Sequence, residues 1–555
     1  MAAPVDLVWL GNLSDQPPWS LGEVRSVEAS PVAMHCLMKE HLPVGGDRAW
    51  LFWDRSLGAP QEESVLQALQ TPGDIWHAGL RLGVGGLPQL IDFVSPGWML
   101  NRDPPVEIIA TSWRCTLRCC LARTTVLEQM RGIHPEFLTL EAAALEWGHR
   151  CIRQGVLIRH VPWLAPEEVV YTDPPQIPLE DELRFIYYCY GRRWSKWALW
   201  RGWLAHYFTL GQATQAWKKV SSGPLPAIPG PFAHRFSPLP GDKPDHKVSV
   251  LIPTLDRYPY LRTLLSQLER QTIRPFEIIV VDQTRSENRY LNLAQDFPNL
   301  PIKMIYQDQP GQCSSRNAGL QMARGEFILF IDDDDEVQPD LIEGQLRSIL
   351  ESGADVSSGV AEEVGAGPLP PDFTYMRLSN VFPTNNTLIY RRLLKKSGLF
   401  DMAYNRLARA DADLGMRLYL SGAYMLLNPR ISVLHHHAPA GGLRAHKARV
   451  ITYAGSRQSL TQRQLPSRSE IYLAKRYFTP RQVRETLWLR ALGTFSVRGG
   501  KLRQAMKIVV GALLFPHTWW QIRTQERQAE EMLKIYPQIP RLDDRETSAA
   551  EVNAQ

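Results

Sequence analysis

The sequence predicts an α/β protein with a mainly parallel sheet, and two observations support this fold class. Short apolar runs typical of buried strands recur in the second half of the chain, at 248–253, 277–281 and 327–331. Between the first two runs, residues 261–271 carry apolar side chains at helical spacing. A strand, a helix and a second strand in this order form the β-α-β unit from which parallel sheets are built.

Each predicted strand is followed closely by acidic residues, namely Asp256, Asp282 and the run 332–335. Because the carboxyl ends of parallel strands lie at one edge of a sheet, we expect these acids to share a cleft. Four adjacent like charges repel one another, so the run 332–335 indicates a divalent cation. The alternative is a solvated acidic turn before a helix that starts near Pro339.

Length, charge and cysteine content narrow the class of protein. A chain of 555 residues is too long for one core and should hold about two to four domains. A net charge of +5 is small for this length and gives no reason to expect nucleic-acid binding. Seven cysteines fit reduced core thiols in a cytoplasmic protein better than disulfides or zinc ligands. The N-terminus does not read as a secretion signal, and the apolar run 508–515 is too short to cross a bilayer.

Three weak echoes between the two halves indicate an internal duplication. Residues 49–60 have the shape of 327–339, with Asp54 in the place of Asp332 and without the other acids. Residues 141–150 echo 410–417, and a later aromatic segment near Tyr187 echoes one near Tyr472. Fewer residues precede Asp54 in the first half than precede Asp332 in the second half. We therefore expect the first half to lack the β-α-β portion that would cradle a nucleotide.

These patterns predict five segments. They are a degenerate first unit at 1–220, a Pro- and Gly-rich linker at 221–246, a catalytic domain at 247–445, a helical region at 446–540 and a disordered tail at 541–555.

Residues 471–527 combine eleven Lys or Arg residues with many Trp, Leu and Phe residues and only two acids, Glu485 and Glu526. This composition is typical of helices that lie on a membrane and meet anionic lipid. It is equally typical of amphipathic helices packed on a catalytic domain, and both interpretations stay open. The first would make the protein peripheral at the cytoplasmic face of a membrane.

A set of motifs in the second half carries a resemblance to a known family. The motifs are 250–254 with Asp256 and Arg257, 279–282, 315–319 with 323–325, 330–334, and 411–414 with Arg417 and Gly422. Over residues 247–440 the chain resembles the family 2 glycosyltransferases, which have the GT-A fold. The resemblance implies a hexosyltransferase-like enzyme (EC 2.4) that uses a nucleotide-sugar and Mn²⁺ or Mg²⁺. The first half would then be a degenerate GT-A-like unit.

The resemblance also implies roles for individual residues. Those expected near the donor nucleotide are Pro253, Thr254, Asp256, Arg257, Asp282, Arg316, Asp332 and Asp333. Asp332 and Asp334 match metal-binding positions, and Asp411 matches the general base of inverting members. The family usually has Asn where this chain has Asp256, and Glu where it has Ala410. The second departure leaves Asp413 as an alternative base.

Three further site predictions come from local sequence. His435 ends a predicted strand and could be another metal ligand, although a surface histidine cluster is the alternative. Asn385 and Asn386 precede a strand and could line the acceptor site, or could simply be turn residues. Arg444 follows two glycines in a segment that we expect to close over the diphosphate as a mobile loop.

The expected acceptor is a glycan or lipid-linked hydroxyl in glycan or polysaccharide biosynthesis, and the first unit could support acceptor binding or a homodimer. Two other functions compete with glycosyl transfer. A nucleotidyltransferase would usually have a Gly-rich phosphate loop after its first strand, whereas 252–257 contains no glycine. A non-catalytic sugar- or lipid-binding scaffold would show no metal-dependent hydrolysis of a nucleotide-sugar.

Overall fold

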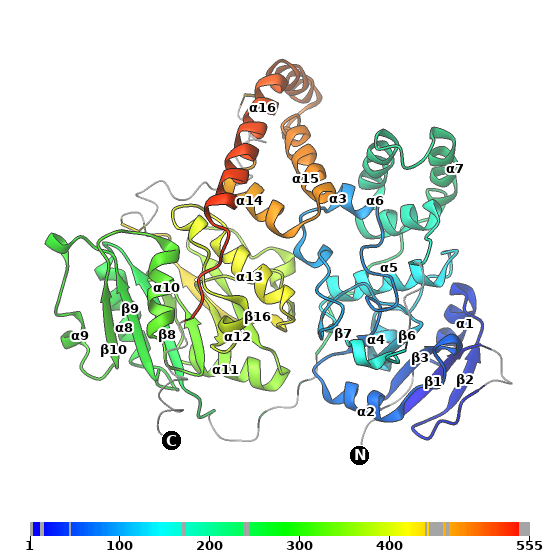
Figure 1. Cartoon of the computed structure of the whole chain (residues 1–555), viewed down its shortest axis with the longest axis horizontal. Helices are drawn as coiled ribbons and strands as arrows, with labels where there is room; N and C mark the ends of the chain where they lie inside the picture. The colour runs from blue at the N-terminus through cyan, green and yellow to red at the C-terminus, as the bar shows by residue number, and fades with distance from the viewer. Residues whose placement is uncertain are drawn as a thin grey trace. The chain divides into compact units, whose positions relative to one another are not determined.

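The structure is a computed structural model (Figure 1). It describes residues 4–11, 16–43, 46–168, 174–234, 236, 239, 244–438, 441–442, 459–461 and 465–542. The Cα positions form two compact units, which we call unit 1 and unit 2. Unit 1 consists mainly of Met1–Phe236 and unit 2 mainly of the chain from Ser237 onward. The predicted tail at 541–555 lies outside the described residues except for its first two.

Unit 1 contains a seven-stranded sheet with the strand order β2-β1-β3-β6-β4-β7-β5. Its strands are β1 (Val5–Leu10), β2 (Val24–Val27), β3 (Ala49–Asp54), β4 (Ile75–His77), β5 (Ala110–Thr111), β6 (Cys119–Arg123) and β7 (Ile158–His160). Strands β1 and β3 are buried along nearly their whole length, as their continuous apolar sequences predict.

Of the helices of unit 1, α5 (Leu140–Arg153) is buried almost throughout. The helices of this unit are α1 (Pro31–His41), α2 (Glu62–Gln70), α3 (Ile91–Val94), α4 (Thr124–Gln129), α5, α6 (Leu179–Leu204) and α7 (Leu210–Val220). Thr139 caps α5 by accepting a hydrogen bond from the Ala142 amide. Helix α6 is kinked at Gly191, whose φ of 80° suits glycine.

The sheet of unit 2 is mixed, with the strand order β10-β9-β8-β11-β15-β13-β16-β12. The strands of this half are β8 (Val248–Thr254), β9 (Glu277–Asp282), β10 (Ile302–Tyr306), β11 (Phe327–Phe330), β12 (Asp335–Val337), β13 (Val356–Glu363), β14 (Arg377–Leu378), β15 (Thr387–Tyr390) and β16 (Met425–His435). Strands β10, β9, β8 and β11 are all parallel, which confirms the predicted α/β fold with a mainly parallel sheet.

Helices cover both faces of the parallel part of this sheet. All the helices of this half are α8 (Tyr258–Leu268), α9 (Leu293–Asp296), α10 (Gln312–Met322), α11 (Leu341–Ser352), α12 (Leu393–Ser397), α13 (Ala410–Leu420), α14 (Arg468–Tyr477), α15 (Pro480–Gly493) and α16 (Lys501–Ile535), of which α8, α10 and α11 cover the parallel strands. Val250 of β8 packs into one core with Leu264 of α8 and Leu346 of α11. The next residue, Leu251, faces α10, where Gly319 allows close approach. Coverage on both faces explains the unbroken apolar runs of these strands.

The two sheets share one topology, which supports the predicted duplication. The path β2-β1-β3-β6-β4-β7 corresponds to β9-β8-β11-β15-β13-β16, with the same sequence of parallel and antiparallel pairings. The expectation that the first half lacks the β-α-β strands was wrong, because β1 and β2 are parallel neighbours. The described residues between β1 and β2 form no helix equivalent to α8, and no described strand lies beyond β2 where β10 lies beyond β9.

All seven cysteines are free, and five of them are buried, as expected for core thiols. Within the described residues, no helix is both long and apolar enough to span a bilayer.

Candidate active site

The carboxyl ends of three parallel strands bring acidic and hydroxyl side chains together in unit 2. Strand β8 lies between β9 and β11, and Thr254 at its end pairs in register with Asp282 at the end of β9. Asp332 follows two residues after the end of β11. The ends of β9, β8 and β11, which carry these side chains, are therefore neighbours in the sheet.

Thr254 and Arg257 hold Asp333 inside the protein. The Thr254 hydroxyl donates to Asp333 Oδ2 at 2.7 Å, and Arg257 Nη1 donates to Oδ1 at 3.0 Å. The same Arg257 nitrogen lies 3.2 Å from Asp334 Oδ2. Burial raises the pKa of Asp333 to about 7 although Arg257 opposes the shift. Both carboxylate oxygens of Asp333, a predicted donor-site residue, are therefore engaged in hydrogen bonds within the protein.

Asp332 is held differently from its neighbours. Arg316, on α10, donates to Asp332 Oδ1 at 2.9 Å and to the hydroxyl of Thr384 at 3.1 Å. The Asp332 side chain is 27% exposed, whereas those of Asp333 and Asp334 are at most 5% exposed. Asp332 is therefore the most accessible carboxylate among these three.

Asp334 and Asp335 meet His435 because β12 pairs with β16, with Asp335 opposite His435. His435 Nδ1 lies 2.8 Å from Asp335 Oδ1 and 3.7 Å from Asp334 Oδ1. Burial raises the pKa of Asp335 to about 7, against the effect of the His435 hydrogen bond. Burial opposes protonation of His435, but its contact with Asp335 and the nearby carboxylates raise its pKa overall. His435 is thus a partner of the acidic cluster rather than a surface residue.

The described residues include no group of three or more His, Cys, Asp or Glu side chains arranged to hold a metal ion. Mg²⁺ in nucleotide sites usually needs only one or two protein carboxylates, since substrate phosphates and water supply the other ligands. His435 Nδ1 is already hydrogen-bonded to Asp335, so only its Nε2 could ligate an ion, and such a carboxylate contact is typical of metal-binding histidines. A cation here would therefore take one or two of these side chains and need a diphosphate and water to complete its ligands.

Asp256 and Asp282 contribute mainly to local backbone structure. Asp256 has a φ of 55°, and Asn and Asp are the non-glycine residues that tolerate this left-handed region best. The replacement of the family's usual Asn by Asp thus keeps the backbone conformation. Asp282 is fully buried and accepts hydrogen bonds from the Tyr258 hydroxyl at 2.7 Å and the Thr284 amide at 2.9 Å. Pro253 is half-buried in β8.

Gly441 and Gly442 lie against the turn after β8. The Gly442 amide donates to the Leu255 carbonyl at 2.8 Å, and a Cβ on Gly442 would collide with the Arg257 guanidinium. Both glycines have positive φ, so a larger residue would be strained at either position. The predicted loop thus begins beside the Arg257 side chain. Arg444 lies outside the described residues.

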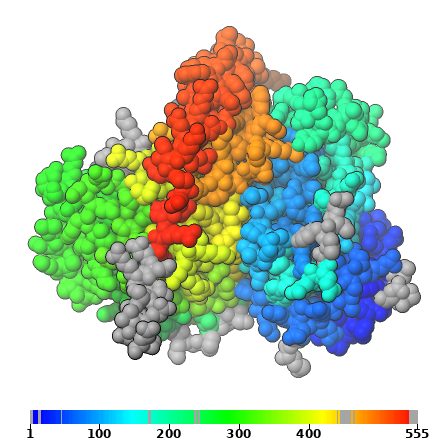
Figure 2. Space-filling view, in the orientation of Figure 1, coloured from blue at the N-terminus to red at the C-terminus, as the bar shows by residue number. Residues whose placement is uncertain are grey.

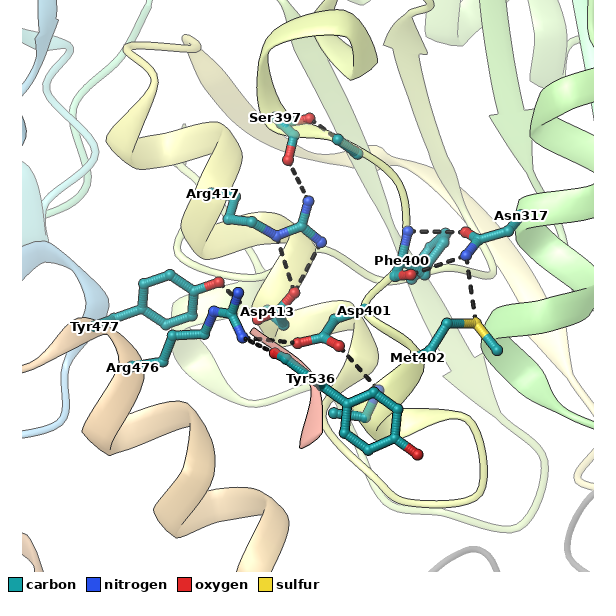
Figure 3. A network of polar contacts seen from close by, with 12 residues as sticks. Asn317, Ser397, Phe400, Asp401, Met402, Asp413, Arg417, Arg476, Tyr477 and Tyr536 are labelled. Atoms are coloured by element: carbon teal, nitrogen blue, oxygen red, sulfur yellow. Dashed lines mark hydrogen bonds and ion pairs between the residues drawn. The ribbon is translucent and has the colours of Figure 1, made fainter. Parts of the chain in front are cut away.

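The two candidate bases on α13 have opposite environments. Asp413 is fully buried, and its Oδ2 accepts from Arg417 Nε at 3.0 Å and Nη2 at 2.8 Å (Figure 3). Its Oδ1 accepts from the Tyr477 hydroxyl at 2.7 Å. Asp411 is exposed and has no hydrogen bond or ion pair with another described residue. Only Asp411 therefore has an uncommitted carboxylate.

Sequence reasoning missed the contacts that α14 makes with Asp401 and with Asp413 of α13. Tyr472 donates to Asp401 Oδ2 at 2.7 Å. Arg476 Nη1 lies 3.2 Å from the same oxygen (Figure 3). Burial and the neighbouring Asp413 raise the pKa of Tyr477, so it stays a hydrogen-bond donor. The predicted helical region is thus joined to the catalytic domain by buried polar contacts. These pairs are about 60 to 75 residues apart in sequence, so no local pattern could reveal them.

The predicted acceptor residues divide into one half-buried and one fully buried side chain. Asn385 is half-buried. The Asn386 amide donates to the carbonyls of Val360 and Ile431 at 3.1 Å each, and its oxygen accepts from Gln345 at 2.7 Å. Asn386 therefore links strands within the sheet, and its side chain has no group left for an acceptor.

Residues 249–414 match the family model described as "Glycosyl transferase family 2". This segment is a family 2 glycosyltransferase domain. Together with the strand order of unit 2, the match confirms the predicted GT-A fold and transferase class of the domain.

The glycosyltransferase domain is also similar to named proteins. The poly(ribitol-phosphate) β-N-acetylglucosaminyltransferase TarS of Staphylococcus aureus is 28% identical over 205 residues, which cover 35% of each chain. The GalNAc(5)-diNAcBac-PP-undecaprenol β-1,3-glucosyltransferase of Campylobacter jejuni is 32% identical over 108 residues, or 19% of this chain and 34% of that protein. The chain thus spans about a third of the length of each relative.

Solved structures with some likeness include TarS 1–349 in complex with UDP-GlcNAc and the mannosyltransferase PcManGT of Pyrobaculum calidifontis with GDP-Man and Mn²⁺. The first has a TM-score of 0.34 at 18% identity and covers 52% of this chain and 91% of that chain. The second has a TM-score of 0.35 at 16% identity and covers 60% and 95%.

Unit 1 has a different arrangement at the strand end that corresponds to β11. Asp54 Oδ2 accepts from Arg118 Nε at 2.9 Å, and its Oδ1 accepts from the Ser56 amide at 2.8 Å. Arg118 also donates to the Ser56 hydroxyl at 3.0 Å. The one acid retained in the first unit thus has a cation of its own and caps a turn.

Unit 1 also repeats the ion pair of α13 without its exposed acid. Glu146 and Arg150 of α5 form a buried pair four residues apart, like Asp413 and Arg417. The offset between the two pairs also aligns Ala144 with Asp411, Gly148 with Gly415 and Gly155 with Gly422. The position of Asp411 is therefore an alanine in the first unit.

We expect Asp413→Ala to lower the free energy of unfolding by about 3–5 kcal/mol, because Arg417 would remain buried without its partner. Tyr477→Phe removes one hydrogen bond to a charged group and should cost about 1.5–3 kcal/mol. The midpoint of urea unfolding measures both losses. Asp411→Ala, on the same helix but exposed, is the matched control and should shift stability by less than about 0.5 kcal/mol. Equal stability of the Asp413 and Asp411 variants would contradict the structural role of Asp413.

Proposed function

We propose that the protein transfers a sugar from a nucleotide-sugar to an acceptor hydroxyl with inversion at the anomeric carbon. One observation carries this proposal. At the family's base position, Asp411 is exposed and has no polar partner among the described residues, whereas both oxygens of the neighbouring Asp413 are occupied. A general base must reach its proton donor directly, which favours Asp411 over Asp413.

Helix α10 supports both parts of the proposed site. Its Arg316 binds Asp332, and its Gln312 donates to the carbonyls of Tyr404 and Leu407, at 2.8 Å in the first case. Asn405 in turn accepts from the Cys313 and Ser314 amides. The chain leading to α13 is thereby anchored on the helix that holds a donor-side carboxylate. This shared anchor would keep donor and base in a fixed geometry.

On the donor side, we assign Thr254, Arg257, Arg316 and Asp332 to the edge that receives the nucleotide. Asp334 and His435 would hold Mn²⁺ or Mg²⁺ there. When bound, such an ion neutralises charge that develops on the leaving diphosphate.

The chemical step that we propose involves one bond made and one broken. Asp411 accepts the proton of the acceptor hydroxyl while that oxygen attacks the anomeric carbon. The bond from this carbon to the diphosphate oxygen breaks on the opposite face, and the nucleoside diphosphate leaves with the electron pair.

The relatives guide the choice of acceptor. One is named for poly(ribitol-phosphate) and another for an undecaprenol-linked sugar. We therefore propose a glycan or lipid-linked acceptor, in glycan or polysaccharide biosynthesis. Unit 1, without counterparts of Asp411 and the acidic run, would serve as a scaffold or acceptor-binding unit.

A donor screen tests the binding part of this proposal. UDP-, GDP- and dTDP-sugars should be compared for their effect on thermal unfolding, with and without Mn²⁺. A ligand at about 100 times its Kd stabilises by about 2.7 kcal/mol, so one nucleotide class should raise the Tm clearly, and more so with Mn²⁺. Asp334→Ala should lose the Mn²⁺-dependent part. A Tm that no nucleotide-sugar changes would argue against donor binding.

A second experiment tests the base. Asp411→Asn should lower kcat by about 10²–10⁴-fold because the amide cannot accept the proton, while the Tm stays the same since the side chain is exposed. Asp54→Ala in unit 1 is the control and should retain activity. Wild-type kcat in both Asp411→Asn and Asp413→Asn would refute the assignment of the base to α13.

A further inference from the structure

Helix α16 exposes a continuous apolar face. Leu502, Met506, Val509, Leu513 and Trp520 are 77%, 46%, 60%, 77% and 62% exposed. Their spacing of three, four or seven residues places them on one side of the helix. Exposed residues of this face between them include alanine and proline rather than charged side chains. Single exposed apolar residues are ordinary, but a stripe of five turns marks an interaction surface.

The opposite face of α16 is already occupied by α15 and by Phe495, which follows α15. Gly511 lies against the ring of Phe495, and the rings of Phe495 and Phe515 are 5.8 Å apart. Farther along, the rings of Trp488 and Trp519 are 5.0 Å apart. Figure 1 shows these two helices side by side, and Figure 2 shows α16 at the surface. The inner face thus packs inside the protein, which leaves the apolar outer face as a separate feature.

Charge indicates what this face meets. Residues 486–525 contain six Lys or Arg residues and no Asp or Glu. Arg498, just before α16, and Lys501, its first residue, are exposed. By contrast, several basic residues of the wider segment are committed internally: Lys475 pairs with Glu526 and Glu530, and Arg476 pairs with Asp401. Within 486–525, Arg490 and Arg523 likewise pair with Glu470 and Glu526, and Lys507 is buried. The exposed cations next to the apolar face therefore include Arg498 and Lys501.

We propose that the face of α16 from Leu502 to Trp520 docks on a lipid bilayer with anionic headgroups, with the helix lying in the plane of the interface. The apolar side chains would enter the boundary between headgroups and acyl chains, while the neighbouring cations would meet lipid phosphates. A second copy of the chain is a less suitable occupant, because residues 502–520 of α16 contain no acid that could pair with the cations of the other copy.

Flotation of the full chain with vesicles tests the proposal. Phosphatidylcholine vesicles should be compared with vesicles that also contain phosphatidylglycerol. We expect flotation with the anionic vesicles and a decline as salt is added. Leu502→Ser, Leu513→Ser and Trp520→Ser should each lower partitioning by about tenfold, because each loses the burial of a large apolar side chain. Lys501→Gln should lower it by about fivefold.

Leu291→Ser is the matched control, since Leu291 is also strongly exposed, at 66%, but lies outside α16. This variant should float like the wild type. The proposal would be overturned if the wild type did not float with anionic vesicles, or if a variant that combines the three serine substitutions floated as well as the wild type. It would also be overturned if the wild type sedimented as a dimer and the serine substitutions abolished this dimer without changing flotation. An unchanged Tm in the serine variants shows that the fold is intact.

Discussion

Four consecutive carboxylates at the end of one buried strand can fold only if positive groups from other parts of the chain meet them. Asp332 receives Arg316 from α10, Asp333 and Asp334 share Arg257 from the start of α8, and Asp335 receives His435 from the end of β16. Each partner lies on a different element. The acidic run therefore fixes how these elements come together, and leaving any of its members unpaired would be costly.

Unit 1 has the same topology but no acidic run that needs several positive partners. It retains a single acid at the equivalent strand end, and Arg118 neutralises it directly. It also retains the buried acid–arginine pair of the helix that carries Asp411 in unit 2, but not the exposed acid. Unit 1 thus has the acid–arginine pairs that stabilise this topology, but no counterpart of the exposed acid or of the acidic run of unit 2.

Much of this could be predicted from sequence because it depends on local pattern. Apolar runs followed by acids predicted the parallel strands of unit 2, and the similarity of the segment at Asp54 predicted a first unit of the same topology. Contacts between distant residues could not be predicted. Nothing near Asp413 indicates that Tyr477 occupies one of its oxygens. Likewise, the short strand β2 has too little apolar pattern to predict that the first unit contains both β1 and β2 as parallel neighbours.

The contact between Tyr477 and Asp413 has a consequence for how the chain can be divided. The family match ends at residue 414, yet the helix that begins just before this point is fastened by a side chain more than sixty residues later. Removing the region after 445 would strip buried hydrogen bonds from Asp413 and Asp401. The smallest autonomous piece of unit 2 therefore extends at least through α14. Recombination that exchanged C-terminal regions between related proteins would have to carry α13 and α14 together.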